Sequence, residues 1–145
     1  MNELAIQELS NSDLIRSRIF TIRGVQVMLD RDLAELYGVA TKALNQAVKR
    51  NIERFPKRYM FQLNKDDVAN MRSQIVTSRW GGTRYLPYAF TEHGIIMLAS
   101  VLNSPTAVEA SVRITDTFVA MRRALASIAP LLSRIEATER RQLKL

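Results

Sequence analysis

Polar side chains that can contact DNA are concentrated in residues 41–54. Asn and Gln can pair with adenine edges, whereas Lys and Arg bind guanine or phosphate. Such side chains reach bases when they lie near the start of a helix, and further along it they reach the phosphate backbone. We therefore expect base contacts from Thr41, Lys42, Asn45 and Gln46, and phosphate contacts from Lys49, Arg50 and Arg54.

A short helix that ends at Gly38 must precede these side chains. Asp30 is expected to be its N-cap, and Asp32 lies in the first turn, where the helix dipole favours a carboxylate. The helix should run to about Tyr37, because Gly38 readily takes the left-handed conformation that ends a helix.

A second helix should carry the polar side chains themselves. Thr41 is expected to be its N-cap, and Pro56 should stop it near Phe55. Its apolar residues, Leu44, Val48 and Ile52, recur every four positions and leave the opposite side polar. Two helices joined in this way are typical of a helix-turn-helix, although an ordinary amphipathic helix with a solvated face has the same pattern.

A glycine-tipped hairpin is expected over residues 73–87, around Gly81 and Gly82. Arg79 and Arg84 flank the tip, so the hairpin could act as a wing that lays cations on phosphates or in a minor groove. Trp80 is interpreted as a packing residue rather than a base-stacking one.

The positive charge of the chain is unevenly placed. The formal net charge is +7, and residues 16–58 hold ten basic residues against four acidic ones, a net +6. A basic segment suits a polyanion, because each phosphate that Lys or Arg neutralises releases condensed counterions. A basic surface that only confers solubility is the alternative that charge by itself leaves open.

Short strands and a third helix are expected around this region. A hairpin turns at Arg23-Gly24, and residues 59–63 have the composition of a strand. Asn64 should then cap a helix to about Arg72, which explains the acidic pair in its first turn without any catalytic role.

Two further helices complete the chain. Thr91 should begin an apolar helix, and Ser104 with Pro105 should begin a long one. The long helix carries two apolar lines, Ala107, Ile114, Phe118, Met121 and Leu125 on one and Val108, Val112 and Val119 on the other. Pro130 is expected to interrupt it before an amphipathic tail helix, whose heptad pattern is broken at Glu139 and Gln142.

Enzymatic and metal-dependent functions find little support in the sequence. The chain has no cysteine, and its lone His93 is not part of a His-Glu-x-x-His motif. Phosphate-binding glycine loops and serine nucleophile elbows are also missing, so we expect no enzyme activity, no metal and no cofactor. A membrane-spanning apolar run and a signal peptide are lacking as well, which favours a cytoplasmic protein with no membrane partner.

Three separated motifs resemble one known family in their order. They are the helix end Leu-Ala-Glu-Leu-Tyr-Gly-Val, the run Lys-Arg-Asn-x-x-Arg-Phe-Pro, and Trp-Gly-Gly-x-Arg-Tyr-Leu-Pro-Tyr-Ala-Phe-Thr-Glu. They lie within the stretches IRGVQVMLDRDLAELYGVATKALNQAVKRNIERFP and SRWGGTRYLPYAFTEHG, between which YMFQL also fits the family. The chain resembles, over about residues 19–123, the phage-type Orf-six N-terminal domain, a relative of the KilA-N DNA-binding domains. This resemblance implies an α+β DNA-binding domain of phages, prophages and bacteria that is commonly joined to a further domain in antirepressor-like proteins.

The sequence thus predicts an α+β protein with a winged helix-turn-helix-like, KilA-N-type domain, short β-hairpins and a C-terminal helical extension. We expect an arm over residues 1–17, the DNA-binding domain over 18–104 and the extension over 105–145. The leading hypothesis is a sequence-specific double-stranded DNA-binding protein that regulates transcription or acts as an antirepressor. The alternative is an interaction module that binds a repressor protein, or a second copy as a homodimer, through the C-terminal helices.

Overall fold

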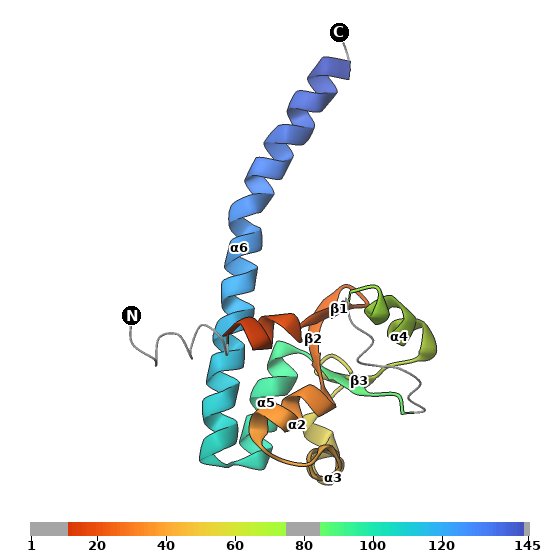
Figure 1. Cartoon of the computed structure of the whole chain (residues 1–145), viewed down its shortest axis with the longest axis vertical. Coiled ribbons are helices and arrows are strands. Elements are labelled where there is room, and N and C mark those ends of the chain that lie inside the picture. Colours follow the sequence, from red (N-terminus) through yellow and green to blue (C-terminus); the bar gives the residue numbers. More distant parts are fainter. Residues whose placement is uncertain (1–11, 75–84, 144–145) are drawn as a thin grey trace.

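The computed structural model describes residues 12–74 and 85–143, and these form an α+β structure (Figure 1). A short helix over residues 12–17 precedes the first strand. The elements that follow are β1 (Phe20–Ile22), β2 (Val25–Leu29), α2 (Asp30–Tyr37), α3 (Thr41–Arg50), the 3-10 turn η1 (Ile52–Arg54), β3 (Met60–Gln62), α4 (Lys65–Arg72), β4 (Tyr88–Phe90), α5 (Glu92–Leu102) and α6 (Pro105–Leu143).

The strands form an antiparallel sheet in the order β1-β2-β4-β3. The hairpin predicted around Arg23-Gly24 is confirmed, since β1 pairs with β2 and both turn residues have positive φ, 53° and 76°. Strand β2 then pairs with β4, which brings residues about sixty positions apart in the chain into register at the centre of the sheet, for example Met28 opposite Phe90.

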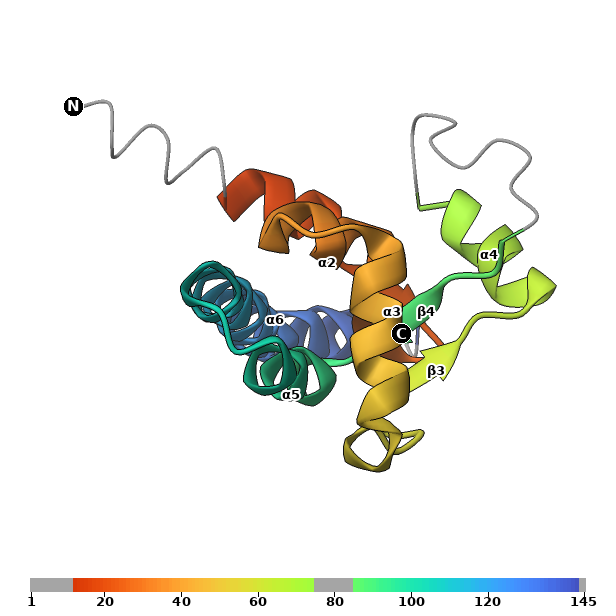
Figure 2. The same ribbon diagram turned by 90° about the horizontal axis from the view of Figure 1, so that it is seen from below.

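Both faces of the sheet are covered, because successive side chains of a strand point to opposite faces. Met28 and Phe90 face the larger core, which they share with residues of α2, α3, α5 and α6. Leu29 and Ala89 face a smaller core, which Met71 of α4 completes. Figure 2 accordingly shows α4 on one side of the strands and the other helices on the opposite side.

Helix α2 has the predicted length, but α3 ends at Arg50 rather than near Phe55, and two of the predicted caps are wrong. Gly38 ends α2 with φ of 69°, as expected. The N-caps are Leu29 and Ala40, neither of which makes a side-chain cap bond, so Asp30 and Thr41 are the first residues inside their helices. Asp30 does not cap α2 with its side chain, because its carboxylate accepts hydrogen bonds from Asn45 and Tyr85, which belong to other elements.

The apolar stripe predicted for α3 is one turn too long. Leu44 and Val48 are buried, but Ile52 is 53% exposed. The helix ends at Arg50, and the 3-10 turn that follows changes the angle between successive side chains. Ile52 is therefore rotated away from the face that Leu44 and Val48 bury.

The predicted starts of α4 and α5 are confirmed. Asn64 and Asp67 form a capping box, with reciprocal bonds of 2.8 and 2.9 Å between side-chain oxygens and backbone N–H groups. Thr91 caps α5 by accepting a 3.3 Å bond from the N–H of Gly94. Gly94 has no room for a side chain, since a Cβ there would lie 2.2 Å from the backbone oxygen of Tyr59.

The long helix α6 begins as predicted, with Ser104 accepting a 3.1 Å bond from the N–H of Ala107. The predicted interruption at Pro130 is wrong, because α6 continues through it to Leu143. A proline costs an exposed helix about 3 kcal/mol through one missing N–H and a steric clash. Its fixed φ nevertheless remains helical, so the axis can continue.

The two halves of α6 have different surroundings. Ala107, Ile114 and Phe118 are buried in the larger core, whereas every residue from 122 to 142 is exposed. Figure 1 shows this second half extending well beyond the rest of the protein. Neither α6 nor another helix of the described residues is apolar over enough of its length to cross a membrane.

Candidate nucleic-acid interface

Helices α2 and α3 are held in a fixed relation by a tight turn and a shared core. After Gly38, the N–H of Val39 donates to the oxygen of Ala34 at 3.0 Å and closes the end of α2. Tyr37 anchors the same helix to α6 through a buried hydroxyl contact of 2.8 Å with Ser111. Burial raises the pKa of Tyr37 to about 12, so its hydroxyl stays protonated at neutral pH.

A fully buried carboxylate, that of Asp30, lies between α2, α3 and the segment before β4. Its Oδ1 accepts from the N–H of Arg31 at 2.8 Å. Its Oδ2 accepts from the Asn45 amide at 3.0 Å, from the Tyr85 hydroxyl, and more weakly from the N–H of Tyr88 at 3.4 Å. These bonds replace the water that a buried carboxylate would otherwise need.

Asn45, one of the predicted base contacts, is positioned by this network. Its amide nitrogen donates to Asp30 at 3.0 Å and to the hydroxyl of Tyr85 at 2.9 Å, so both of its N–H bonds are used. Burial and the bond to Asp30 raise the pKa of Tyr85, which keeps this hydroxyl protonated at neutral pH. The Asn45 side chain is therefore held against α2 and presents its carbonyl oxygen rather than its amide nitrogen as the available group.

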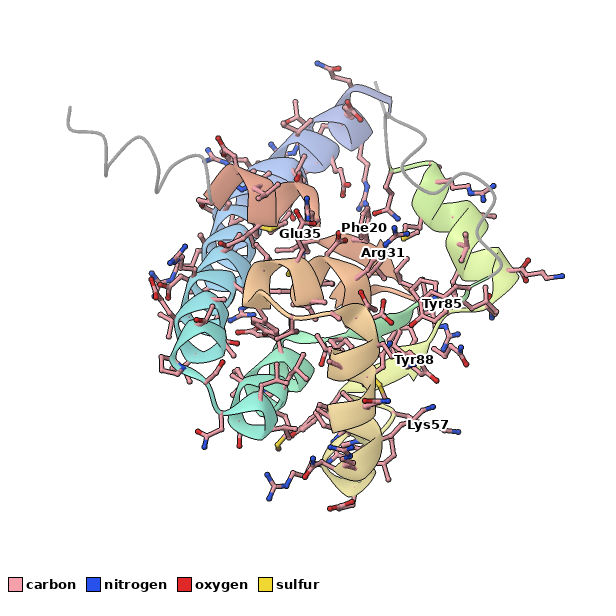
Figure 3. All side chains as sticks on the ribbon, turned by 60° about the horizontal axis from the view of Figure 1, so that its bottom comes forward. Phe20, Arg31, Glu35, Lys57, Tyr85 and Tyr88 are labelled. Carbon is pink, nitrogen blue, oxygen red and sulfur yellow. The ribbon has the colours of Figure 1, made fainter. Side chains whose placement is uncertain are left out.

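The other residues predicted to read bases surround a shallow depression of about 590 Å³ beside α3. Its walls combine cationic, amide, hydroxyl and aromatic side chains, namely Arg31, Thr41, Lys42, Asn45, Gln46, Lys49 and Tyr85. Figure 3 shows Arg31, Tyr85 and Tyr88 following one another along one side of α2 and α3. All four predicted base contacts and one predicted phosphate contact thus meet at one concave surface.

Two predicted phosphate contacts, Arg50 and Arg54, are exposed near the far end of α3 and outside the depression. They extend a basic surface that includes Lys57, which Figure 3 places beyond Tyr88. Residues 41–59 contain six Lys and Arg residues against the single acid Glu53, a net +5. Within the part of the chain that the structure describes, none of these six side chains forms an ion pair with a carboxylate.

Other basic residues of the segment 16–58 are neutralised within the protein. Arg18 is 12% exposed and contacts Asp32 at 3.3 Å and Glu35 at 2.5 Å. Arg23 binds Asp67 through two bonds of 2.7 and 3.2 Å and lies 4.6 Å from the Phe61 ring. The region whose basic residues are available to a polyanion is therefore smaller than the sequence suggests. It centres on α3 and the residues just after it.

The predicted wing lies outside the described residues, and so do Arg79, Trp80, Arg84 and the Gly81-Gly82 tip. The described chain resumes at Tyr85, which contacts Asp30 and Asn45 beside the depression.

Sequence reasoning missed two residues of this surface. Arg31 is adjacent to Asp30 and carries charge, which could have indicated a role at the helix start. Tyr85 lies fifty-five positions from Asp30, and no spacing pattern relates the two residues. Only the pairing of β2 with β4 brings the Tyr85 segment next to α2.

No group of three or more His, Cys, Asp or Glu side chains that could hold a metal ion occurs among residues 12–74 and 85–143. The ring of His93 stacks on Tyr59, with centroids 5.7 Å apart. The chemistry that the surface around α3 can supply is hydrogen bonding and the attraction of anions.

Comparison with known proteins gives one match. The family model of the ORF6N domain matches residues 17–101, which is more than half of the chain and includes every element from β1 to most of α5. No curated protein and no solved structure matches the chain.

Proposed function

The chain belongs to the ORF6N domain family, and from this membership and the surface of α3 we propose that it binds double-stranded DNA sequence-specifically. In this proposal α2 and α3 form a helix-turn-helix of the winged, KilA-N type, with α3 as the helix that enters the major groove. The protein acts as a phage- or prophage-type regulator of transcription or as an antirepressor, and works in the cytoplasm.

The observation that carries the proposal is the arrangement of charge around α3. Lys42 and Lys49 lie beside the depression, Arg50 and Arg54 continue the basic surface, and no described carboxylate pairs with any of them. Protein–DNA affinity depends strongly on such cations, because their binding to phosphates releases counterions. By contrast, the ion pairs of Arg18 and Arg23 show that this protein neutralises basic residues where they have a structural role.

The depression gives each side chain a distinct part in binding. Gln46 and Lys42 are exposed near the start of α3, where side chains reach base edges. Asn45 offers its carbonyl oxygen in a fixed position, which suits an exocyclic amino group of adenine or cytosine. Lys49, Arg50 and Arg54 bind phosphates and set the register of α3 in the groove.

Selection of bound duplexes from a random library, at two salt concentrations, tests the proposal. Lys49→Ala should weaken binding to all sequences alike and reduce the salt slope by about one. Gln46→Ala should relax the preference at one base pair and leave the salt slope unchanged. Lys65→Ala on α4 is the matched control, since Lys65 is also an exposed lysine but lies on the far side of the sheet from α3.

Each outcome bears on a different part of the proposal. Absence of duplex binding at low salt would refute it. Equal losses for Lys49→Ala and Lys65→Ala would show that net charge, rather than the surface of α3, attracts the DNA.

Interaction with another protein is the second candidate function, and the exposed apolar residues of α6 favour it. Leu125, Ile128, Leu131, Leu132 and Ile135 are each between 45% and 60% exposed on one helix. Soluble proteins seldom leave so many large apolar side chains uncovered on one element.

A further inference from the structure

The exposed half of α6 continues a regular apolar stripe that starts in the core. Large apolar residues alternate at intervals of four and three positions through Ile114, Phe118, Met121, Leu125, Ile128, Leu132 and Ile135. This is the a/d spacing of a coiled coil, with Leu125 and Leu132 at a positions and Ile128 and Ile135 at d positions. Ile114 and Phe118 are buried against the protein's own core, and from Leu125 onward the stripe is exposed.

The second half of α6 lacks the support that a helix of its length needs. Residues 122–142 are exposed throughout, and most of the stability of a helix in a protein comes from the packing of its apolar face. Pro130 weakens it further, but it falls at the f position, on the side opposite the stripe. The defect therefore faces solvent, while the apolar side remains continuous.

We propose that this half of α6 pairs antiparallel with the same segment of a second copy, with the two-fold axis near Pro130. In that alignment Leu125 packs against Ile135 of the other copy, and Ile128 packs against its Leu132. Leu131 meets its own counterpart at the axis. All five exposed apolar side chains of the segment are then covered.

Three features favour the antiparallel arrangement over the parallel one. Leu at a with Ile at d disfavours two-stranded parallel coiled coils. Parallel pairing would also place Glu139 directly opposite its own counterpart at an a position, where like charges repel. Antiparallel pairing instead brings Arg122 opposite Glu136 of the other copy, twice per dimer. Arg122 contacts Glu92 within its own chain at 2.6 Å but its side chain is 60% exposed, and Glu136, which lies 4.0 Å from Arg140 of its own chain, is 68% exposed, so both side chains are accessible to a second copy.

The antiparallel dimer has a consequence that depends on the proposed DNA binding. In Figure 1, α3 lies at the end of the protein away from the C-terminus of α6, and Figure 2 shows it at the front of that end. Antiparallel pairing therefore points the two α3 surfaces in opposite directions. The dimer then bridges two duplex segments, rather than binding adjacent half-sites of one palindrome.

Light scattering of the full chain over a concentration series tests the pairing. The wild type should pass from monomer to dimer, and Ile128→Glu should remain monomeric. Val112→Glu is the matched control, because Val112 is 55% exposed on the same helix but outside the stripe. A wild type that stays monomeric at every concentration overturns the proposal, and so does a Val112→Glu variant that loses the dimer equally. A different protein would then be the partner that covers the apolar stripe.

Disulfide trapping tests the orientation, since the chain has no native cysteine. Chains with Leu125→Cys and chains with Ile135→Cys should form a mixed disulfide when combined, because the alignment brings these positions within bonding distance. Leu125→Cys alone should give little disulfide. Efficient disulfide formation between two Leu125→Cys chains, in a dimer or a higher oligomer, overturns the antiparallel arrangement.

Capture of a labelled duplex by a bead-bound duplex tests bridging. The wild type should link the two, whereas Ile128→Glu should bind single duplexes with unchanged affinity but lose the capture. Dimers that bind duplexes without linking them overturn the bridging inference. If no duplex is bound at all, the proposed function fails, and the light-scattering and trapping results still decide the pairing.

Discussion

Two aspartates in the first turns of short helices, Asp30 in α2 and Asp67 in α4, have different hydrogen-bond partners and different structural roles. Asp67 completes a capping box with Asn64 three residues earlier, and it also pairs with Arg23 of the β1–β2 hairpin, 44 positions away. Asp30 makes only one local bond, to the N–H of Arg31. Its remaining partners, Asn45, Tyr85 and Tyr88, come from other elements.

The difference between these aspartates shows how one residue type in the first turn of a helix can either stabilise that helix or position a side chain of a candidate binding site. An acid near a helix start is favoured by the helix dipole in either case. Asp67 keeps contact with its own turn, whereas Asp30 is fully buried and its Oδ2 faces α3 and the segment before β4. The Asp30 carboxylate thereby fixes the side chain of a predicted DNA contact.

The largest effect is expected for Asp30→Ala. The change removes an acceptor shared by several donors and leaves the Asn45 amide and the Tyr88 N–H in a partly buried environment without it. We expect a loss of about 2–3 kcal/mol in the free energy of unfolding, together with weaker DNA binding, since Asn45 is no longer held. Urea unfolding and duplex binding of the same sample measure the two effects.

Two variants control for this result. Asp30→Asn keeps the shape and one acceptor oxygen, so it should lose less stability than Asp30→Ala. Asp66→Ala removes an exposed first-turn acid of α4 and should change stability by less than about 0.5 kcal/mol. Equal losses for Asp30→Ala and Asp66→Ala would mean that the buried network around Asp30 contributes nothing beyond the helix dipole.

The contrast also explains which parts of the structure could be predicted from the sequence. The cap at Asn64, the turn at Arg23-Gly24 and the end of α2 at Gly38 were predicted correctly, because each depends on residues a few positions apart. The cap assigned to Asp30 was wrong, because its carboxylate has partners from other elements, and two of them, Tyr85 and Tyr88, are brought near it by strand pairing between distant segments.

The candidate site shows the same division. The polar residues of α3 could be predicted from their spacing, and the structure gathers most of them around one depression. Tyr85 could not be predicted, nor could the use of Arg18 and Arg23 in internal ion pairs. A count of charges contains no information on which cations face a carboxylate from another element.

A smaller effect is expected for Asp67→Ala. Loss of the capping box should cost about 1 kcal/mol, and DNA binding should remain unchanged, because α4 lies on the far side of the sheet from α3. Chemical unfolding and duplex binding are again the measurements. A loss of DNA affinity in this variant would contradict the separation between a structural and a functional aspartate.

The pH dependence of stability should also distinguish Asp67. The hydrogen bond from Arg23 and that from the Asn64 backbone hold the pKa of Asp67 below its usual value. A lowered pKa contributes stability that is present above the unfolded value of about 3.9 and is lost as the pH falls through the folded pKa. Unfolding curves of the wild type and Asp67→Asn should therefore converge on acidification below about pH 4, and parallel curves would contradict this.

The smallest effect is expected for Tyr85→Phe. The change removes one donor to Asp30 and one acceptor for Asn45 but keeps the ring beside the depression, and Tyr85 is 43% exposed, so water can replace part of what is lost. We expect a loss of about 0.5–1 kcal/mol in stability. Asn45 then has only Asp30 to hold its amide, so duplex selection should show a relaxed preference at one base pair with an unchanged salt slope. An unchanged preference would mean that Asp30 suffices to orient Asn45, and would leave Tyr85 as part of the wall of the depression.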